Sequence, residues 1–113
     1  MRRKKLCTCL GLIALTALAG IVHADTGLDR AALLQLADDY LAALAAHDSG
    51  KVPLAGDVKI VENLKRIKTG EGLWKTATSL PTDYKIVVPD PVSQQVGGLV
   101  VMGTGGKPAQ VGF

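Results

Sequence analysis

The sequence predicts an α+β protein in which a long N-terminal helix packs in a sheet of mixed or antiparallel strands. Two observations predict this class. Apolar residues recur at three-to-four spacing over one long stretch, residues 27–47, as on the buried face of a helix. The rest of the chain, residues 48–113, consists mostly of short segments rich in β-branched residues and separated by glycine and proline, which is typical of strands joined by turns.

The first element is an amphipathic helix expected over residues 27–47. Thr26, followed three residues later by Asp29, resembles a capping box at its start, and "HDSG" ends it. The apolar stripe comprises Leu28, Leu33, Leu36, Ala37, Tyr40, Leu41 and Leu44. Because this stripe is wide, the helix is expected to lie on something large and flat.

A strand and a short helix are expected next. The segment "VKIVE", residues 58–62, alternates as a strand does, with Val58, Ile60 and Glu62 on the face that should be buried. The basic and polar residues that follow lead to "EGLWKTATSL", in which apolar residues have helical spacing until Pro81 stops the helix. The Glu62 carboxylate therefore lies at the end of an apolar strand face, and Trp74 follows it in the sequence.

The C-terminal third reads as strands. "DYKIVV" and "SQQVGGLVVM" flank a "PDP" breaker, and "GTGGK" turns the chain into a return strand, "PAQVGF". The glycines and lysine of this turn do not match a nucleotide-binding loop, because Pro108 stands where the third glycine of a dinucleotide fingerprint belongs. No repeat or long linker interrupts the order, so one domain is expected over residues 25–113.

The N-terminus has the three regions of a secretory signal peptide, expected over residues 1–24. Four basic residues precede an apolar run from Leu6 to Val22, and small residues at Val22 and Ala24 mark a cleavage site after Ala24. The run is shorter than the roughly 20 residues that a membrane anchor needs. The protein is expected to be secreted or periplasmic. The pair Arg2-Arg3 leaves open whether the general or the twin-arginine route is used.

Removal of the signal changes the charge argument. Residues 25–113 carry nine basic and ten acidic residues, so no nucleic acid and no membrane is expected as a partner. Both cysteines, Cys7 and Cys9, fall in the signal, and His47 is the one histidine that remains. No metal or cofactor is therefore expected.

His47 and the pair Asp38-Asp39 have structural explanations. His47 stands at a helix C-terminus, where the helix dipole favours a partly positive side chain. Asp38 and Asp39 are neighbours on the helix, so their side chains point apart on a solvated face.

Three residues are candidates for a site: Tyr40 on the helix stripe, Glu62 at the strand end and Trp74 at the start of the short helix, with Leu73 beside it. Each has an ordinary structural explanation, as a core aromatic or as a carboxylate that reaches water. Together they describe an apolar pocket with a few polar groups, the usual form of a small-ligand site.

The segments "YLAALAAHD", "VEN", "GEGLWKTAT" and "DYKIVVPDPVSQQVGGLVVM" resemble the SnoaL-like branch of the nuclear-transport-factor-two-like superfamily, over Leu28 to Phe113. The resemblance implies a cone, in which a curved sheet wraps the long helix and an apolar pocket opens at the wide end. It also implies that Trp74, behind two glycines, walls or closes the pocket. Members include isomerases, dehydratases and cyclases alongside proteins that only bind.

The candidate residues and the resemblance together leave three hypotheses open. The first is binding of a small apolar ligand by Trp74, Tyr40 and Leu73. The second is an isomerase, dehydratase or cyclase reaction in which Glu62 moves a proton and Tyr40 donates to an oxyanion. The third is an inactive fragment, because the family cone has further strands after "GGKPA" that this sequence lacks. Their absence would leave an open sheet edge, through which a homodimer could form.

Overall fold

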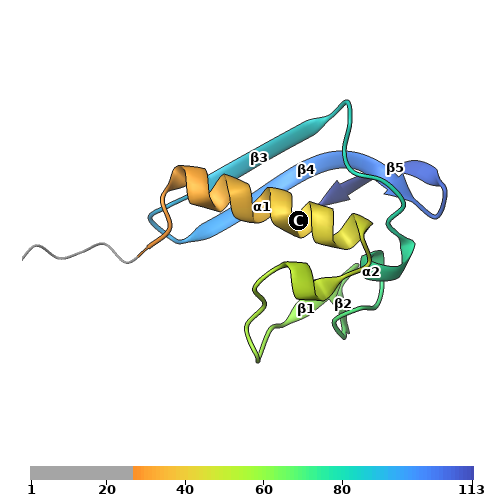
Figure 1. Cartoon of the computed structure of the whole chain (residues 1–113), viewed down its shortest axis with the longest axis horizontal. Coiled ribbons are helices and arrows are strands. Elements are labelled where there is room, and N and C mark those ends of the chain that lie inside the picture. Colours follow the sequence, from red (N-terminus) through yellow and green to blue (C-terminus); the bar gives the residue numbers. More distant parts are fainter. Residues whose placement is uncertain (1–26) are drawn as a thin grey trace, which may run out of the picture.

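The computed structural model describes residues 27–113, so the signal peptide expected over residues 1–24, and Thr26 of the expected capping box, lie outside the described residues. The described part is an α+β structure with one helix longer than a single turn and two antiparallel sheets. In chain order the elements are α1 (Arg30–Ala45), the 3-10 turn η1 (Ser49–Lys51), β1 (Ile60–Glu62), β2 (Lys65–Ile67), α2 (Leu73–Thr76), β3 (Lys85–Asp90), β4 (Gln95–Thr104) and β5 (Lys107–Gly112) (Figure 1).

Helix α1 begins three residues later than predicted. Asp29 is its N-cap, and the Asp29 carboxylate accepts a hydrogen bond of 2.8 Å from the backbone N–H of Ala32. This satisfies one of the amides that have no partner within the helix. The helix ends at Ala45, two residues earlier than expected, because His47 takes a φ of 55°, a left-handed value that cannot continue it.

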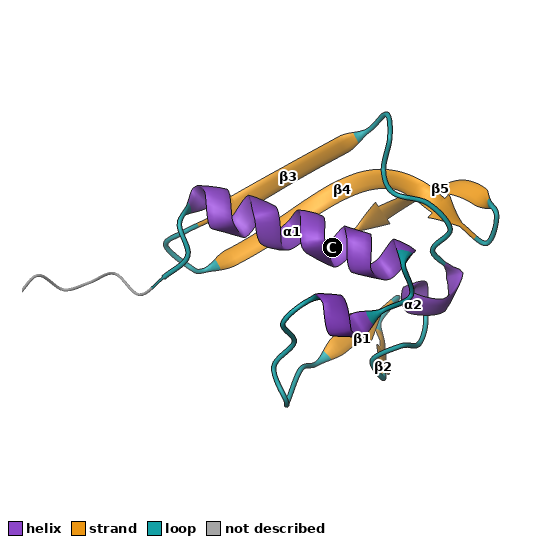
Figure 2. Cartoon of the chain, in the orientation of Figure 1, coloured by secondary structure: helices purple, strands orange, loops and turns teal. Residues whose placement is uncertain are grey.

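Strands β3, β4 and β5 form an antiparallel meander, and α1 lies across one face of it (Figure 2). The register places Val100 of β4 opposite both Lys85 of β3 and Val111 of β5. Side chains alternate along a strand, so Val100 and Met102 share the face that α1 covers, and both are buried. The helix stripe thus packs on the central strand of the sheet.

The predicted strands of the C-terminal third are confirmed, with one correction. The "PDP" segment does not break β3, which continues through Pro89 and Asp90. β3 is an edge strand of this sheet, where a residue without an N–H is tolerated. The turn comes directly afterwards, where the Asp90 carboxylate accepts from the backbone of Val92 and Ser93. The hydrogen bond from the Ser93 hydroxyl, together with these two backbone bonds, lowers the pKa of Asp90.

The region between the helix and the meander differs more from the prediction. β1 runs from Ile60 to Glu62 instead of from Val58, which is 38% exposed, and β2 was not expected at all. The short helix is a single turn, not a helix reaching Leu80. It stops at Ala77 because the backbone there pairs with Thr104 of the meander, a tertiary contact that outweighs helical spacing.

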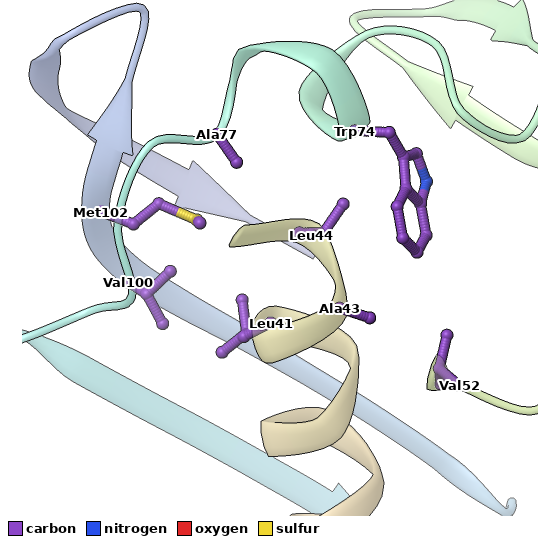
Figure 3. Close-up of a cluster of buried hydrophobic side chains, with 8 residues drawn as sticks. All are labelled: Leu41, Ala43, Leu44, Val52, Trp74, Ala77, Val100 and Met102. Atoms are coloured by element: carbon purple, nitrogen blue, oxygen red, sulfur yellow. The ribbon is translucent and has the colours of Figure 1, made fainter. Parts of the chain in front are cut away.

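One hydrophobic cluster joins these elements (Figure 3). Its buried members are Leu41, Ala43 and Leu44 of α1, Val52, Trp74 and Ala77, and Val100 and Met102 of β4. Burial of each large side chain contributes about 2 kcal/mol to folding. Figure 3 shows the Trp74 ring beside the last turns of α1, so the single tryptophan belongs to the core. No helix within residues 27–113 combines the length and the apolar character needed to cross a membrane.

Candidate functional site

Tyr40 is the centre of an aromatic group at the end of the core. Its ring meets that of Trp74 edge-on, with centroids 5.7 Å apart and planes at 86°, and lies 6.2 Å from that of Phe113. Edge-on contact places the positive edge of one ring against the negative face of the other. Tyr40, Leu73 and Phe113 are partly exposed, whereas Trp74 is buried. The group therefore extends from the core to the surface.

Trp74 carries an unusual polar atom. The residue is 2% exposed, and its indole N–H, at Nε1, is buried with no hydrogen-bond partner among the described residues. A buried indole N–H usually finds an acceptor, and leaving it unpaired costs about 1–3 kcal/mol. Trp74 is thus a core residue whose indole N–H remains available to donate a hydrogen bond.

Glu62 explains the glycine that stands two residues before the tryptophan. Its Oε2 accepts a hydrogen bond of 2.8 Å from the backbone N–H of Leu73, at the first residue of α2. The carboxylate comes so close that a Cβ on Gly72 would lie 2.2 Å from the same oxygen. Gly72 also has a φ of 59°, which a side chain disfavours. The position of the Glu62 carboxylate therefore requires a glycine at residue 72 of the "GEGLW" segment.

Tyr40 and Glu62 influence one another electrostatically. Burial raises the pKa of the Tyr40 phenol above 10.0, and the negative charge of Glu62 raises it further. Tyr40 consequently remains a neutral O–H donor at neutral pH. Its hydroxyl has no hydrogen-bond partner among residues 27–113. Two donors, the phenol and the indole, thus share a site with one carboxylate.

His47 holds the other side of α2 in place. Its Nδ1 lies 2.6 Å from the carbonyl oxygen of Trp74, which links the residue after α1 to the single turn of α2. This contact explains the histidine as a structural residue at the helix C-terminus. Asp38 of α1 pairs with Lys85 on the surface, and Asp39 accepts from Gln35, so these two aspartates belong to the exposed face as predicted.

The structure brings together all four residues that the sequence singled out: Tyr40, Glu62, Trp74 and Leu73. Sequence reasoning missed Phe113, whose ring lies 2.5 Å from the position that a Cβ on Gly98 would take. The signal in the sequence was the pair Gly97-Gly98 within "SQQVGGLVVM", because a glycine in a strand permits close approach of another group. Phe113 and Gly98 exchange two backbone hydrogen bonds, of 2.9 and 3.0 Å.

Two hollows in the described surface lie away from this group. One, of about 270 Å³, is lined by Thr78, Ser79, Met102 and Lys107 among others, and the second, of about 350 Å³, lies between α1 and Leu80. Neither is lined by Tyr40, Glu62 or Trp74. Residues 27–113 contain no cluster of three acidic, histidine or cysteine side chains that could hold a metal ion.

No protein-family model, no curated protein and no solved structure matches this chain. The site itself offers a buried indole N–H that has no partner among residues 27–113, a neutral phenol, a carboxylate and apolar surroundings.

Proposed function

We propose that this protein is an exported member of the SnoaL-like branch that binds a small, mostly apolar and uncharged molecule carrying one hydrogen-bond acceptor. The observation that carries the proposal is the buried Trp74 N–H, which has no acceptor among the described residues. Native proteins rarely leave such a group unpaired, and a bound ligand atom is one way to satisfy it.

The chemistry of the site selects the type of ligand. Trp74 and Tyr40 offer donors, so the ligand supplies an acceptor such as a carbonyl oxygen. The charge of Glu62 already raises the pKa of Tyr40, and it would equally disfavour an anionic ligand. The surrounding Leu73 and Phe113 are apolar. A neutral ketone or lactone fits these demands better than a carboxylate or a phosphate.

The family resemblance supports the same location. In the cone that it implies, the pocket opens beside the short helix after "GEG", and here α2 carries Trp74 against the last turns of α1. We propose that the curved sheet of such a cone corresponds to β3–β5 and that the ligand enters over Tyr40, a partly exposed member of the aromatic group.

Binding can be tested by calorimetric titration with neutral cyclic ketones and the matching hydrocarbons. Trp74→Phe keeps an aromatic ring but removes the N–H, and Tyr40→Phe removes the hydroxyl alone. Each variant is expected to weaken ketone binding about tenfold and to leave hydrocarbon binding unchanged, because a lost hydrogen bond in an apolar site costs about 1 kcal/mol or more.

Tyr84→Phe is the matched control, because Tyr84 is exposed and lies outside the aromatic group. Equal affinity of the wild type for a ketone and its hydrocarbon would contradict the role given to the indole N–H. Unchanged ketone binding in both aromatic variants would remove Trp74 and Tyr40 from the site.

A second function, proton transfer at such a ketone, is favoured by one observation: a carboxylate and a neutral phenol share the site. Glu62 would take a proton from the carbon beside the carbonyl, and Tyr40 would donate to the oxygen as negative charge develops there. Ketone protons that exchange in heavy water with the wild type, but not with Glu62→Gln, would assign this reaction. Gln keeps an oxygen for the Leu73 amide, so loss of exchange would not reflect a loosened α2.

A further inference from the structure

The β1–β2 hairpin ends in a conformation that its residues disfavour. Asn63 and Leu64 form a two-residue turn with φ values of 49° and 66°, as the turn type that suits antiparallel strands requires. Asparagine tolerates this conformation, but the second position is normally glycine. A leucine with positive φ is an outlier, because its Cβ approaches the following carbonyl oxygen.

The same leucine is almost completely exposed. Leu64 is 99% exposed at the tip of the hairpin, and Val61, on the outer face of β1, is 64% exposed. Figure 2 shows the hairpin standing off the body that α1 and β3–β5 form. Neither packing within the chain nor turn preference explains a leucine here. A strained and exposed apolar residue is therefore a candidate for contact with another surface.

The charges around the tip indicate which surface. Within residues 59–68 there are one carboxylate, Glu62, and four exposed cations, Lys59, Lys65, Arg66 and Lys68. Asp57 and Glu71 flank this segment, and the Glu71 carboxylate accepts a hydrogen bond from the backbone N–H of Lys68. Glu62 is turned toward α2, where it accepts from the Leu73 amide. None of the four cations forms an ion pair with a described residue. The near-neutral total charge of residues 25–113, from which neither a nucleic acid nor a membrane is expected as a partner, conceals this local excess.

We infer that the β1–β2 hairpin docks on an anionic lipid bilayer, with Leu64 inserted between the headgroups and the surrounding lysines and arginine bound to lipid phosphates. An apolar tip that projects between cations matches the layered chemistry of a bilayer surface, in which hydrocarbon lies beneath negative headgroups. The long apolar stems of Lys and Arg can lie along the interface while their charges stay in water. A flat protein partner would call for a broader apolar patch than one projecting side chain.

Vesicle flotation tests the inference with the full-length protein. Vesicles of phosphatidylcholine mixed with phosphatidylglycerol are compared with vesicles of phosphatidylcholine alone, at low and high salt. All variants share residues 1–26, so differences between variants cannot come from that segment. The wild type is expected to bind the anionic vesicles preferentially and to lose that preference at high salt.

Leu64→Gly distinguishes an effect on vesicle binding from an effect on stability. Glycine relieves the positive φ, so the variant is expected to unfold at the same temperature or higher, while its binding to anionic vesicles falls about tenfold because the inserted side chain is gone. Val92→Ser is the matched control: Val92 is 96% exposed in the turn between β3 and β4, and its replacement is expected to leave binding unchanged.

The contribution of charge is tested by combining Lys65→Gln with Arg66→Gln. Binding to anionic vesicles should fall about 25-fold, since each cation near an anionic surface contributes about fivefold. Replacement of Lys75 and Lys107, away from the tip, is the control. The inference is overturned if Leu64→Gly binds anionic vesicles as the wild type does, or if the wild type does not prefer them. Capture by immobilised polyglutamate without vesicle binding would overturn it as well, and would indicate an acidic protein partner.

Discussion

Two of the antiparallel hairpins within residues 27–113, β1–β2 and β4–β5, share a turn geometry but use different residues for it. Between β4 and β5, Gly105 and Gly106 have φ values of 58° and 78°, which glycine adopts without strain. Between β1 and β2, Asn63 and Leu64 take nearly the same values. The first hairpin builds the sheet beneath α1. The second stands apart from that sheet and presents its turn to the outside, so folding alone does not explain its residues.

The hairpins also differ in what holds them. Strand β4, which pairs with β5, is held by packing of α1, and Leu41 and Val100 belong to the same buried cluster. The β1–β2 hairpin is tied to α2 by the Glu62 carboxylate, which accepts from the backbone N–H of Leu73. Mutations in the core beneath α1 should therefore lower the stability of the whole fold. Mutations that break the contact between Glu62 and α2 should affect the β1–β2 hairpin alone.

The largest effect is expected for Leu41→Ala. Leu41 is 2% exposed in the core cluster, and removal of its side chain leaves a cavity that costs about 3 kcal/mol of unfolding free energy. Urea denaturation followed by circular dichroism measures it. Leu64→Ala, at a 99% exposed position, serves as control and is expected to change stability by less than about 0.5 kcal/mol. Equal losses in the two variants would contradict the assignment of the core.

A smaller, local effect is expected for Gly72→Ala. The new Cβ would lie 2.2 Å from Glu62 Oε2 at a φ of 59°, so the carboxylate must leave the Leu73 amide, at a cost of about 2 kcal/mol. Hydrogen exchange should become faster for the amides of β1 and β2 but not for those of β4. Gly56→Ala is the control, because a Cβ there would meet nothing within 4 Å. Uniform acceleration across the sheet would show that the two hairpins are not separately anchored.

The smallest effect concerns Tyr40, where the body meets the hairpin. Its pKa is raised above 10.0, so the folded state holds the phenol proton more tightly than the unfolded state does. The corresponding stability is complete below pH 10 and is lost as the pH rises through the folded pKa. In a Tyr84→Phe background, absorbance should show Tyr40 titrating above 10.0, and Glu62→Gln should lower that value. A Tyr40 titration unaffected by Glu62→Gln would mean that the two residues are not coupled.

Much of the fold could be predicted because it follows from local patterns. The helical stripe on α1, the β-branched content of β3 and β4, and the glycines of the last turn are all local features of the sequence. Strand β2 was missed because its segment, "KRI", is mostly exposed and charged. The end of α2 was missed because it depends on the pairing of Ala77 with Thr104, far apart in the chain.

The candidate site was likewise predictable only in part, where its residues follow a local pattern. Tyr40 and Trp74 could be placed near one another because each lies on the apolar face of a helix predicted from spacing. The bond from the Leu73 amide to Glu62, and the approach of Phe113 to Gly98, join residues separated by loops of irregular structure. No periodicity encodes such contacts, although the glycines at 72 and 98 mark where they occur.

The contact between His47 and Trp74 has a consequence for the hydrogen atoms of the imidazole. A backbone carbonyl oxygen can only accept, so Nδ1 of His47 must carry the proton in the 2.6 Å bond. The neutral ring is thereby held in the Nδ1–H tautomer, with its basic lone pair on Nε2, and nitrogen chemical shifts would distinguish this form. Asparagine, which can donate from its amide and tolerates the φ of 55°, is the replacement that would satisfy both demands of this position.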